Sequence, residues 1–436
     1  MNLLIKQSVP LVIKIAVMMT SLYMVARNLP PLVGSFRYIW GPSALILIFL
    51  VHSPAFKVKA MKYLILYGAL SLGLLQFTIW QYMVEWHRSS ILNEFYSILI
   101  FLAIFCYYYS RRDYKGLARV AQLGFYFILI TVIMTNIALF INPMIVRQSI
   151  SGEFAPSQGQ VFRLTGLAGY GYVQAFVCLI PVLVYYIKTK SKGKRLFSNK
   201  YLIILLLLLL ITLVHAQIFA NILAAVAILV LSFAGVERIG RATIMVVFSI
   251  IMIWLIPASF YADIFYDLSS FFDPESNIHY KLRELSIIIQ YPNLDPSTAF
   301  GYRTARYPYL FEQFISNPIL GVASSSSMTS LFDYNSRMWS HTFWINRLTI
   351  WGLLGFGIYI FVLFQVFQKI YSIFDTEFKF YYLLSVSAFV LLGLMKNIAG
   401  REPYLMLIVV IPGLYFLPLL RHQRNKTTFN NSVSIH

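Results

Sequence analysis

The stretch RVAQLGFYFILITVIMTNIALFI, residues 119–141, has the length and composition of a membrane-spanning helix. Its one charged residue, Arg119, stands at the first position. A helix needs roughly 20 apolar residues to cross the hydrocarbon core of a bilayer, which is about 30 Å thick. The stretch therefore predicts a helix that crosses a membrane completely.

Similar runs recur along the whole chain of 436 residues. Hydrophobic residues make up 59% of it and charged residues only 12%, and the mean hydropathy is +0.71, which is outside the range of soluble domains. We predict an all-α polytopic membrane protein with about twelve spans. They lie near residues 9–26, 38–52, 62–80, 91–109, 119–141, 164–187, 201–214, 217–234, 242–261, 346–368, 379–397 and 403–420.

The basic residues orient these spans. An even number of spans places both ends on one side, and the basic tail RHQRNKTT, residues 421–428, indicates that this side is the cytoplasm. We expect the first run to be a retained span, because Lys14 lies inside it and no clear cleavage site follows. The predicted divisions are 1–261 with nine spans and a shorter outward loop at 143–163, 262–345 as a large outward loop, 346–420 with three spans, and the cytoplasmic tail 421–436.

Arginine is in excess on the predicted outward side. The cytoplasmic segments hold 13 Lys and 8 Arg, and the outward segments hold 2 Lys and 11 Arg. The net charge of +19 therefore reflects topology and is no sign of nucleic-acid binding. A guanidinium grips phosphate oxygens with two donors, so the excess favours an anionic phosphorylated ligand. The alternative is pairing with outward acids, among them Asp263, Asp267, Asp273, Glu275, Glu284 and Glu312.

The large outward loop has helical patterns of its own. In FGYRTARYPYLFEQFISNPILGVAS, residues 300–324, apolar side chains recur at helical spacing, and Asn317-Pro318 with Gly321 ends the element. This pattern predicts an amphipathic helix that lies on the membrane or on the helix bundle, with Arg303 and Arg306 at its beginning. The apolar positions are Tyr307, Leu310, Phe311, Phe314 and Ile315. A second stripe predicts another short helix, from Ile278, Leu282, Leu285 and Ile289.

A histidine stands where this loop meets the next span, in WSHTFWINRLTIWGLLGF, residues 339–356. His341 follows Arg337 by four residues, so the two share a face if the segment is helical. Its imidazole can accept a proton from a hydroxyl near neutral pH. The alternative is an interfacial residue without catalytic work. No spacing typical of a metal site occurs, and the two cysteines, Cys106 and Cys178, lie in predicted spans, which makes disulfides and cysteine metal sites improbable.

Taken together, these two segments resemble the bacterial O-antigen polymerase and O-antigen ligase superfamily. Members carry an outward loop with an arginine, an aromatic residue four positions later and an Asn-Pro-x-x-Gly-Val end, followed by a histidine that opens a helix with Gly-x-x-Gly. The matching positions are Arg303, Tyr307, Asn317, Pro318, Gly321, Val322, His341, Gly352 and Gly355. The match covers about 55 residues closely and the rest of the chain only in helix number and loop placement.

The resemblance implies a GT-C-like membrane glycosyltransferase fold and a metal-independent enzyme without a cofactor. Its donor would be a glycan on undecaprenyl diphosphate, with Arg303 on the diphosphate and His341 as the base that activates the acceptor hydroxyl. Arg163 fits a second diphosphate or glycan contact. Two departures are Thr342 in place of the common Asn, and LVHAQIFAN, residues 213–221, which lacks the family's arginine. That contact is then left to Arg306, Arg337 or Arg401.

These implications favour a polysaccharide polymerase in the bacterial inner membrane. It would transfer the growing chain to a new lipid-linked repeat unit on the periplasmic side, and a separate partner protein would set chain length. A ligase that uses lipid A core as acceptor has the same chemistry and stays open as an alternative. A lipid-linked oligosaccharide flippase is the alternative from another class, although the large outward loop and the absence of a sequence repeat disfavour it.

Overall fold

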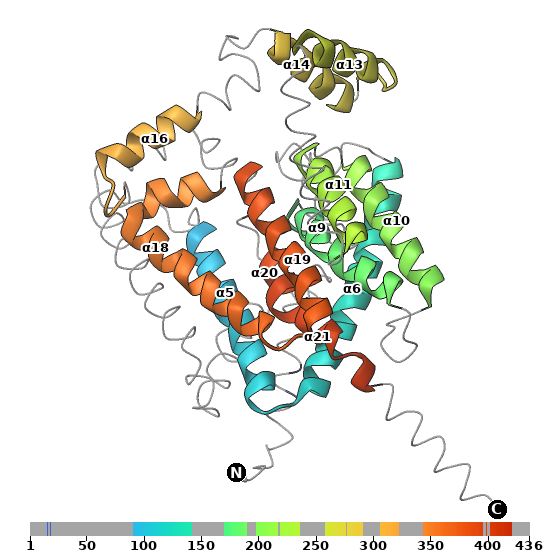
Figure 1. Ribbon diagram of the computed structural model, residues 1–436, viewed down its shortest axis with the longest axis vertical. Coiled ribbons are helices and arrows are strands. Elements are labelled where there is room, and N and C mark those ends of the chain that lie inside the picture. The colour runs from blue at the N-terminus through green and yellow to red at the C-terminus, as the bar shows by residue number, and fades with distance from the viewer. Residues whose placement is uncertain are drawn as a thin grey trace, which may run out of the picture.

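The computed structural model describes twelve parts of the chain. They are residues 15, 18, 90–141, 170–189, 198–216, 219–235, 258–275, 277–290, 306–321, 343–395, 398 and 402–420. Within these residues the chain is mostly helical and has no strand, as Figure 1 shows. The predicted all-α class is therefore confirmed for the part of the chain that the structure describes.

Eight of the predicted spans coincide with described helices. These helices are α5 (Ser90–Ser110), α6 (Tyr114–Ile141), α9 (Tyr170–Lys188), α10 (Asn199–His215), α11 (Phe219–Ala234), α18 (Phe343–Tyr371), α19 (Thr376–Met395) and the consecutive α20 (Glu402–Leu405), η7 (Met406–Val410) and α21 (Ile411–Tyr415). The runs at 38–52 and 62–80, and nearly all of 9–26 and 242–261, lie outside the described residues, as does the loop at 143–163.

Five of the described segments are long and apolar enough to cross a membrane. They are Tyr114–Ile141, Gly171–Lys188, Phe343–Tyr371, Thr376–Leu394 and Glu402–Leu420. Asn199–His215 and Ala220–Ala234 are apolar but shorter. The membrane character predicted from composition thus has a structural counterpart, whereas the number of twelve spans stays a prediction.

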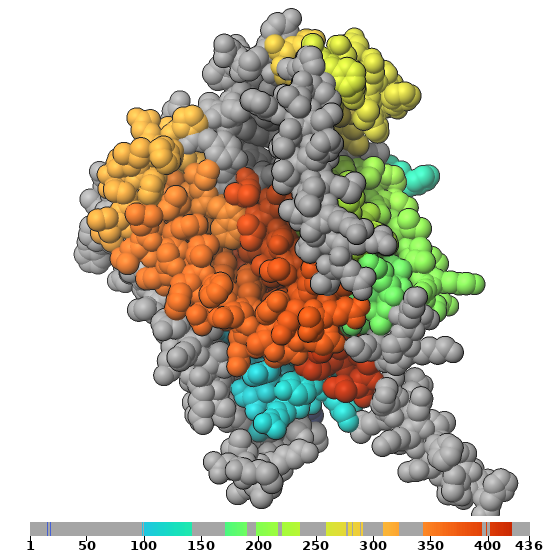
Figure 2. All heavy atoms as spheres, in the orientation of Figure 1, coloured from blue at the N-terminus to red at the C-terminus, as the bar shows by residue number. Residues whose placement is uncertain are grey.

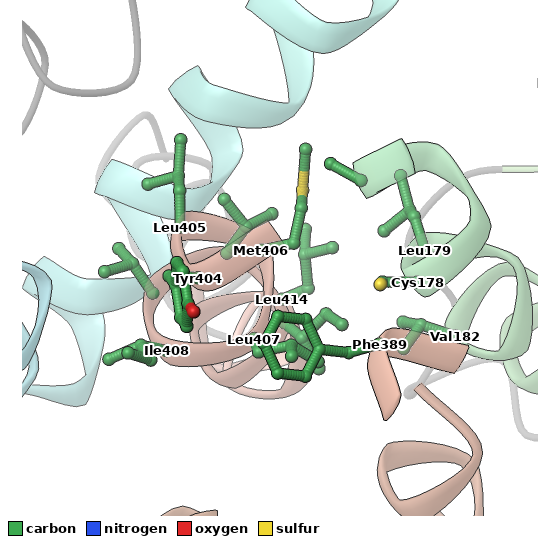
Figure 3. Close-up of a cluster of buried hydrophobic side chains, with 14 of the residues drawn as sticks. Cys178, Leu179, Val182, Phe389, Tyr404, Leu405, Met406, Leu407, Ile408 and Leu414 are labelled. Atoms are coloured by element: carbon green, nitrogen blue, oxygen red, sulfur yellow. The ribbon is translucent and has the colours of Figure 1, made fainter. Parts of the chain in front are cut away.

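The core lies where α9, α19 and the Glu402–Leu420 segment meet. Helix α9 packs against α10, α11 and α19, and α20 packs against α9 and α5. Apolar side chains fill the centre of this bundle. Figure 3 shows Cys178, Leu179 and Val182 from α9, Phe389 from α19, and Tyr404, Leu405, Met406, Leu407, Ile408 and Leu414 from the last segment. Cys106 and Cys178 are both buried and free, so neither forms a disulfide.

Close approach and hydrogen bonds fix the helices against one another. A Cβ on Gly413 would meet the Leu117 carbonyl and the Ala121 side chain of α6 closer than 3.0 Å, so α21 and α6 touch through this glycine. The Tyr186 hydroxyl donates to the Leu414 carbonyl at 2.9 Å. These contacts replace the hydrophobic driving force that helices lack in lipid.

Three further helices belong to the region predicted as a large outward loop. They are α13 (Ala258–Ser270), α14 (Asn277–Gln290) and α16 (Arg306–Ser316). The predicted helices around Ile278 and Leu310 are confirmed as α14 and α16. Helix α13 runs across the predicted boundary between residues 261 and 262.

Candidate functional site at the junction of α16 and α18

The residues predicted to do chemistry lie almost entirely outside the described residues. This holds for His341, Arg303, Arg163 and Arg337. Arg306 is the first residue of α16, and only its backbone is described. The structure describes the two helices that adjoin these residues in sequence. They are α16 and α18, and α18 begins two residues after His341.

Helix α16 ends in a tight turn formed by residues 317–321. Asn317 donates its backbone N–H to the Phe314 carbonyl at 3.1 Å, and Gly321 donates to the Asn317 carbonyl at 2.8 Å. Gly321 has a φ of +74°, in the left-handed region that glycine adopts at little cost. The predicted end of the element at Asn317, Pro318 and Gly321 is therefore confirmed.

Helix α18 is interrupted at Gly352. This residue has φ 60° and ψ −172°, a backbone conformation that is essentially restricted to glycine. The break divides α18 into a short segment, 343–351, and a long segment, 353–371, which Figure 1 shows at different inclinations. The span predicted near 346–368 lies within Phe343–Tyr371, but the break at Gly352 was not predicted, because the apolar pattern of the sequence continues through it.

The turn of α16 fits directly into this break. Leu353 donates its backbone N–H to the Pro318 carbonyl at 2.8 Å, and Leu354 donates to the Ile319 carbonyl at 3.1 Å. The first N–H groups of a helix have no partner within it. The carbonyls of the α16 turn satisfy two of them at the start of the long segment, so one element caps the other.

The two glycines make this contact possible. A Cβ on Gly321 would meet the Ile350 carbonyl and the Gly352 nitrogen, and a Cβ on Gly352 would meet the Ile319 carbonyl and the Gly321 nitrogen. These are backbone atoms, which cannot move aside as a flexible side chain can. Gly355 makes no comparable contact with another element in the part of the chain that the structure describes. The neighbours that a Cβ there would meet are atoms of the Trp351 side chain in α18 itself.

A buried side-chain hydrogen bond extends the junction. Thr349 is 1% exposed, and its hydroxyl donates to the Leu310 carbonyl at 3.0 Å. Leu310 itself is buried. The contact thus joins the middle of α16 to the short segment of α18, beyond the turn at Gly321.

Replacing Thr349 with valine keeps the side-chain shape but removes the donor. We expect α16 to loosen by about 1 kcal/mol, the usual net contribution of a hydrogen bond, which raises amide hydrogen exchange in residues 306–321 about fivefold. Thr135→Val is the matched control, because the buried Thr135 hydroxyl donates to Thr131 in its own helix. Exchange in α16 that is unchanged by Thr349→Val contradicts this contact.

A charged residue is buried in the short segment of α18. Arg347 is 3% exposed, and its Cζ lies 4.9 Å from the centroid of the Phe343 ring. Asn346 beside it is equally buried. Burying a guanidinium costs desolvation free energy, which polar or aromatic partners must offset. Its burial therefore indicates a specific polar environment around Arg347. Arg347 is one of the 11 arginines predicted on the outward side, and its position six residues after His341 is the sequence signal that could have marked it as a candidate site residue.

Aromatic side chains hold this segment against α19. The Trp344 indole N–H donates to the Val390 carbonyl at 2.9 Å. The rings of Phe343 and Phe389 lie edge to face with Trp344. The position of the segment that follows His341 is therefore set by α19 as well as by α16.

Two more polar groups escaped sequence analysis. The Glu402 carboxylate, at the start of α20, lies so close to Gly171 of α9 that a Cβ there would collide with it. Asn221 of α11 is fully buried, and neither polar atom of its side-chain amide has a hydrogen-bond partner among the described residues. Asn221 ends the stretch 213–221, where the resembled family has an arginine.

No group of three or more His, Cys, Asp or Glu side chains that could hold a metal ion occurs among the described residues. The chain matches no protein-family model and no curated protein.

Proposed function

We propose that this chain is a membrane glycosyltransferase that polymerises a surface polysaccharide. The hydroxyl at the non-reducing end of a new lipid-linked repeat unit attacks the anomeric carbon of the growing chain. The bond between that carbon and the diphosphate oxygen breaks, undecaprenyl diphosphate leaves, and the hydroxyl proton passes to a base. The growing chain thereby moves onto the new unit.

One observation carries this proposal: the two halves of the family pattern meet. Gly321, at the end of the first half, packs backbone to backbone against Gly352 in the second half, although 30 residues separate them. The contact joins the helix that begins at Arg306 to the helix that begins two residues after His341. The two segments thus form one structural unit, which supports a shared role for the residues next to them in sequence.

The proposed roles follow the chemistry of the residues. His341 accepts the hydroxyl proton, because a neutral imidazole is a suitable base near pH 7. Arg303 binds the diphosphate and stabilises the charge that develops on it as it leaves, work that a metal ion does in other enzymes. Arg306, Arg163 and Arg337 are further diphosphate contacts, for which the outward arginine excess is the support. The catalysis is then metal-independent.

We propose the fold, the membrane and the orientation of the enzyme as follows. The chain has a GT-C-like fold of twelve spans in the bacterial inner membrane, with both ends in the cytoplasm and the site on the periplasmic side. Its donor and acceptor are glycans on undecaprenyl diphosphate, and a separate membrane protein regulates chain length. The apolar described helices support the membrane part of this statement.

Deleting the gene from its organism distinguishes the polymerase from its alternatives. We expect loss of long polysaccharide, with lipid A core that carries a single repeat unit, measured on lipopolysaccharide ladders. Bare core together with long chains on undecaprenyl diphosphate would instead identify a ligase. Bare core with single lipid-linked repeats held on the cytoplasmic side would identify a flippase. Either of the last two results overturns the polymerase assignment.

A further inference from the structure

The apolar residues of α16 lie on two sides of the helix. Leu310 is 4% exposed and faces the contact with Thr349 of α18. Phe311 and Ile315, one helical turn apart, are 56% and 59% exposed. The apolar stripe that was predicted as a single face is therefore divided between two environments. One side packs on α18, and the other presents large apolar side chains at the surface.

This exposed side continues into the turn and onto α18. Ile319 in the turn is 65% exposed. Its carbonyl accepts a hydrogen bond from the Leu354 N–H. Leu353 and Leu354 of α18 are also exposed. Figure 2 shows the atoms of α16 and α18 as one continuous surface. Further along the long segment the exposed apolar side chains are Ile360, Phe361 and Phe364. We call the set Phe311, Ile315, Ile319, Leu353 and Leu354 the apolar ridge.

The length of α18 sets the depth of the ridge. The long segment, 353–371, has 19 residues and is about 28 Å long at 1.5 Å per residue, which is close to the hydrocarbon thickness. Its exposed apolar side chains then face lipid. The junction stands at the first turn of this segment, so in a bilayer that the segment crosses it would lie where hydrocarbon gives way to headgroups. In Figure 1 the axis of α16 is inclined to that of the long segment and does not extend its line.

We propose that α16 is an interfacial helix, with the apolar ridge inserted into the lipid of the bilayer that α18 crosses. The occupant is bulk acyl chain, because the ridge is continuous with the lipid-facing side of a spanning helix. Glu312 and Ser316, adjacent in sequence to Phe311 and Ile315, are exposed polar residues that remain in the headgroup and water layer. Apolar residues on one side and polar residues on the other are typical of helices that lie about 5–10 Å into the interface.

A fluorescent probe on either side of α16 tests this inference independently of the proposed chemistry. Ile315→Cys and Ser316→Cys are labelled separately with an environment-sensitive fluorophore in the full chain. Cys106 and Cys178 are fully buried and are not expected to react. The proteins are reconstituted in phosphatidylcholine vesicles with or without brominated acyl chains. We expect quenching by the brominated lipid to be about twofold or more stronger at 315 than at 316.

Two results would overturn the inference. Equally weak quenching at the two positions means that the ridge does not face the lipid, and equally strong quenching means that α16 has no polar side outside the lipid. Weak lipid quenching at 315, combined with protection from aqueous iodide, means that protein covers the ridge, either a second copy or another chain. Labelled Ile319→Cys provides a second variant on the ridge, in case the probe at 315 disturbs folding.

Discussion

Alanine in place of Gly352 should separate α16 from α18 and abolish polymer formation. The new Cβ would collide with the Ile319 carbonyl and the Gly321 nitrogen, and alanine strongly disfavours a φ of 60° with ψ of −172°. We expect a loss of roughly 3 kcal/mol or more of local stability. The measurements are the thermal midpoint of the purified protein in detergent and the polysaccharide ladder in cells.

Gly357→Ala is the control for this prediction, because Gly357 lies in the same helix and a Cβ added there would meet no atom within 4 Å. It should match the unsubstituted protein in both measurements. Gly321→Ala should reproduce the Gly352→Ala defect from the other side of the contact. The double variant should be little worse than either single one, since both remove the same junction. Full stability and full-length polymer in Gly352→Ala would contradict the described junction.

His341→Ala and Arg303→Ala should each remove long polysaccharide while protein level and lipid-linked single repeats persist. Loss of a general base lowers rates by about 10²- to 10⁴-fold, and an unscreened diphosphate is a poor leaving group without its cation. Arg303→Lys should recover only part of the activity, because lysine keeps the charge but lacks the planar fork of donors. Ladder length and lipid-linked repeats are measured in a deletion strain that expresses each variant.

Matched controls for these substitutions come from the described part of the chain. His215 is exposed at the end of α10, and Arg283 is exposed on α14, where its guanidinium contacts Tyr266. His215→Ala and Arg283→Ala should leave the ladders unchanged. Normal ladders in His341→Ala and Arg303→Ala would remove both residues from the proposed site.

Periodicity and hydropathy predicted most of the described helices, for physical reasons. A run such as 119–141 has one stable conformation in lipid, because a helix satisfies every backbone group internally. The spacing that predicted α16 and α14 also reflects a local property, since residues three and four apart share a helix face. Both kinds of signal depend on near neighbours in sequence, and the helices α6, α14 and α16 lie where these signals predicted them.

What sequence analysis missed depends on contacts between distant segments. The break at Gly352 is hidden in an apolar run, and it is stable because carbonyls from the turn after α16 satisfy the N–H groups that it frees. The split of the α16 stripe between α18 and an exposed side arises in the same way. Burial of Arg347 likewise depends on its surroundings, so its charge type alone did not distinguish it from the other outward arginines. The roles of His341 and Arg303 stay predictions.

The most direct test of the central claim is polymerisation by the purified chain. The protein is reconstituted with a single kind of undecaprenyl-diphosphate-linked repeat unit in excess chelator, and products are separated by length. We expect a ladder of lipid-linked chains that is unaffected by the chelator and absent with His341→Ala. Unextended repeats with the unsubstituted protein, or extension that strictly requires a divalent cation, would contradict it.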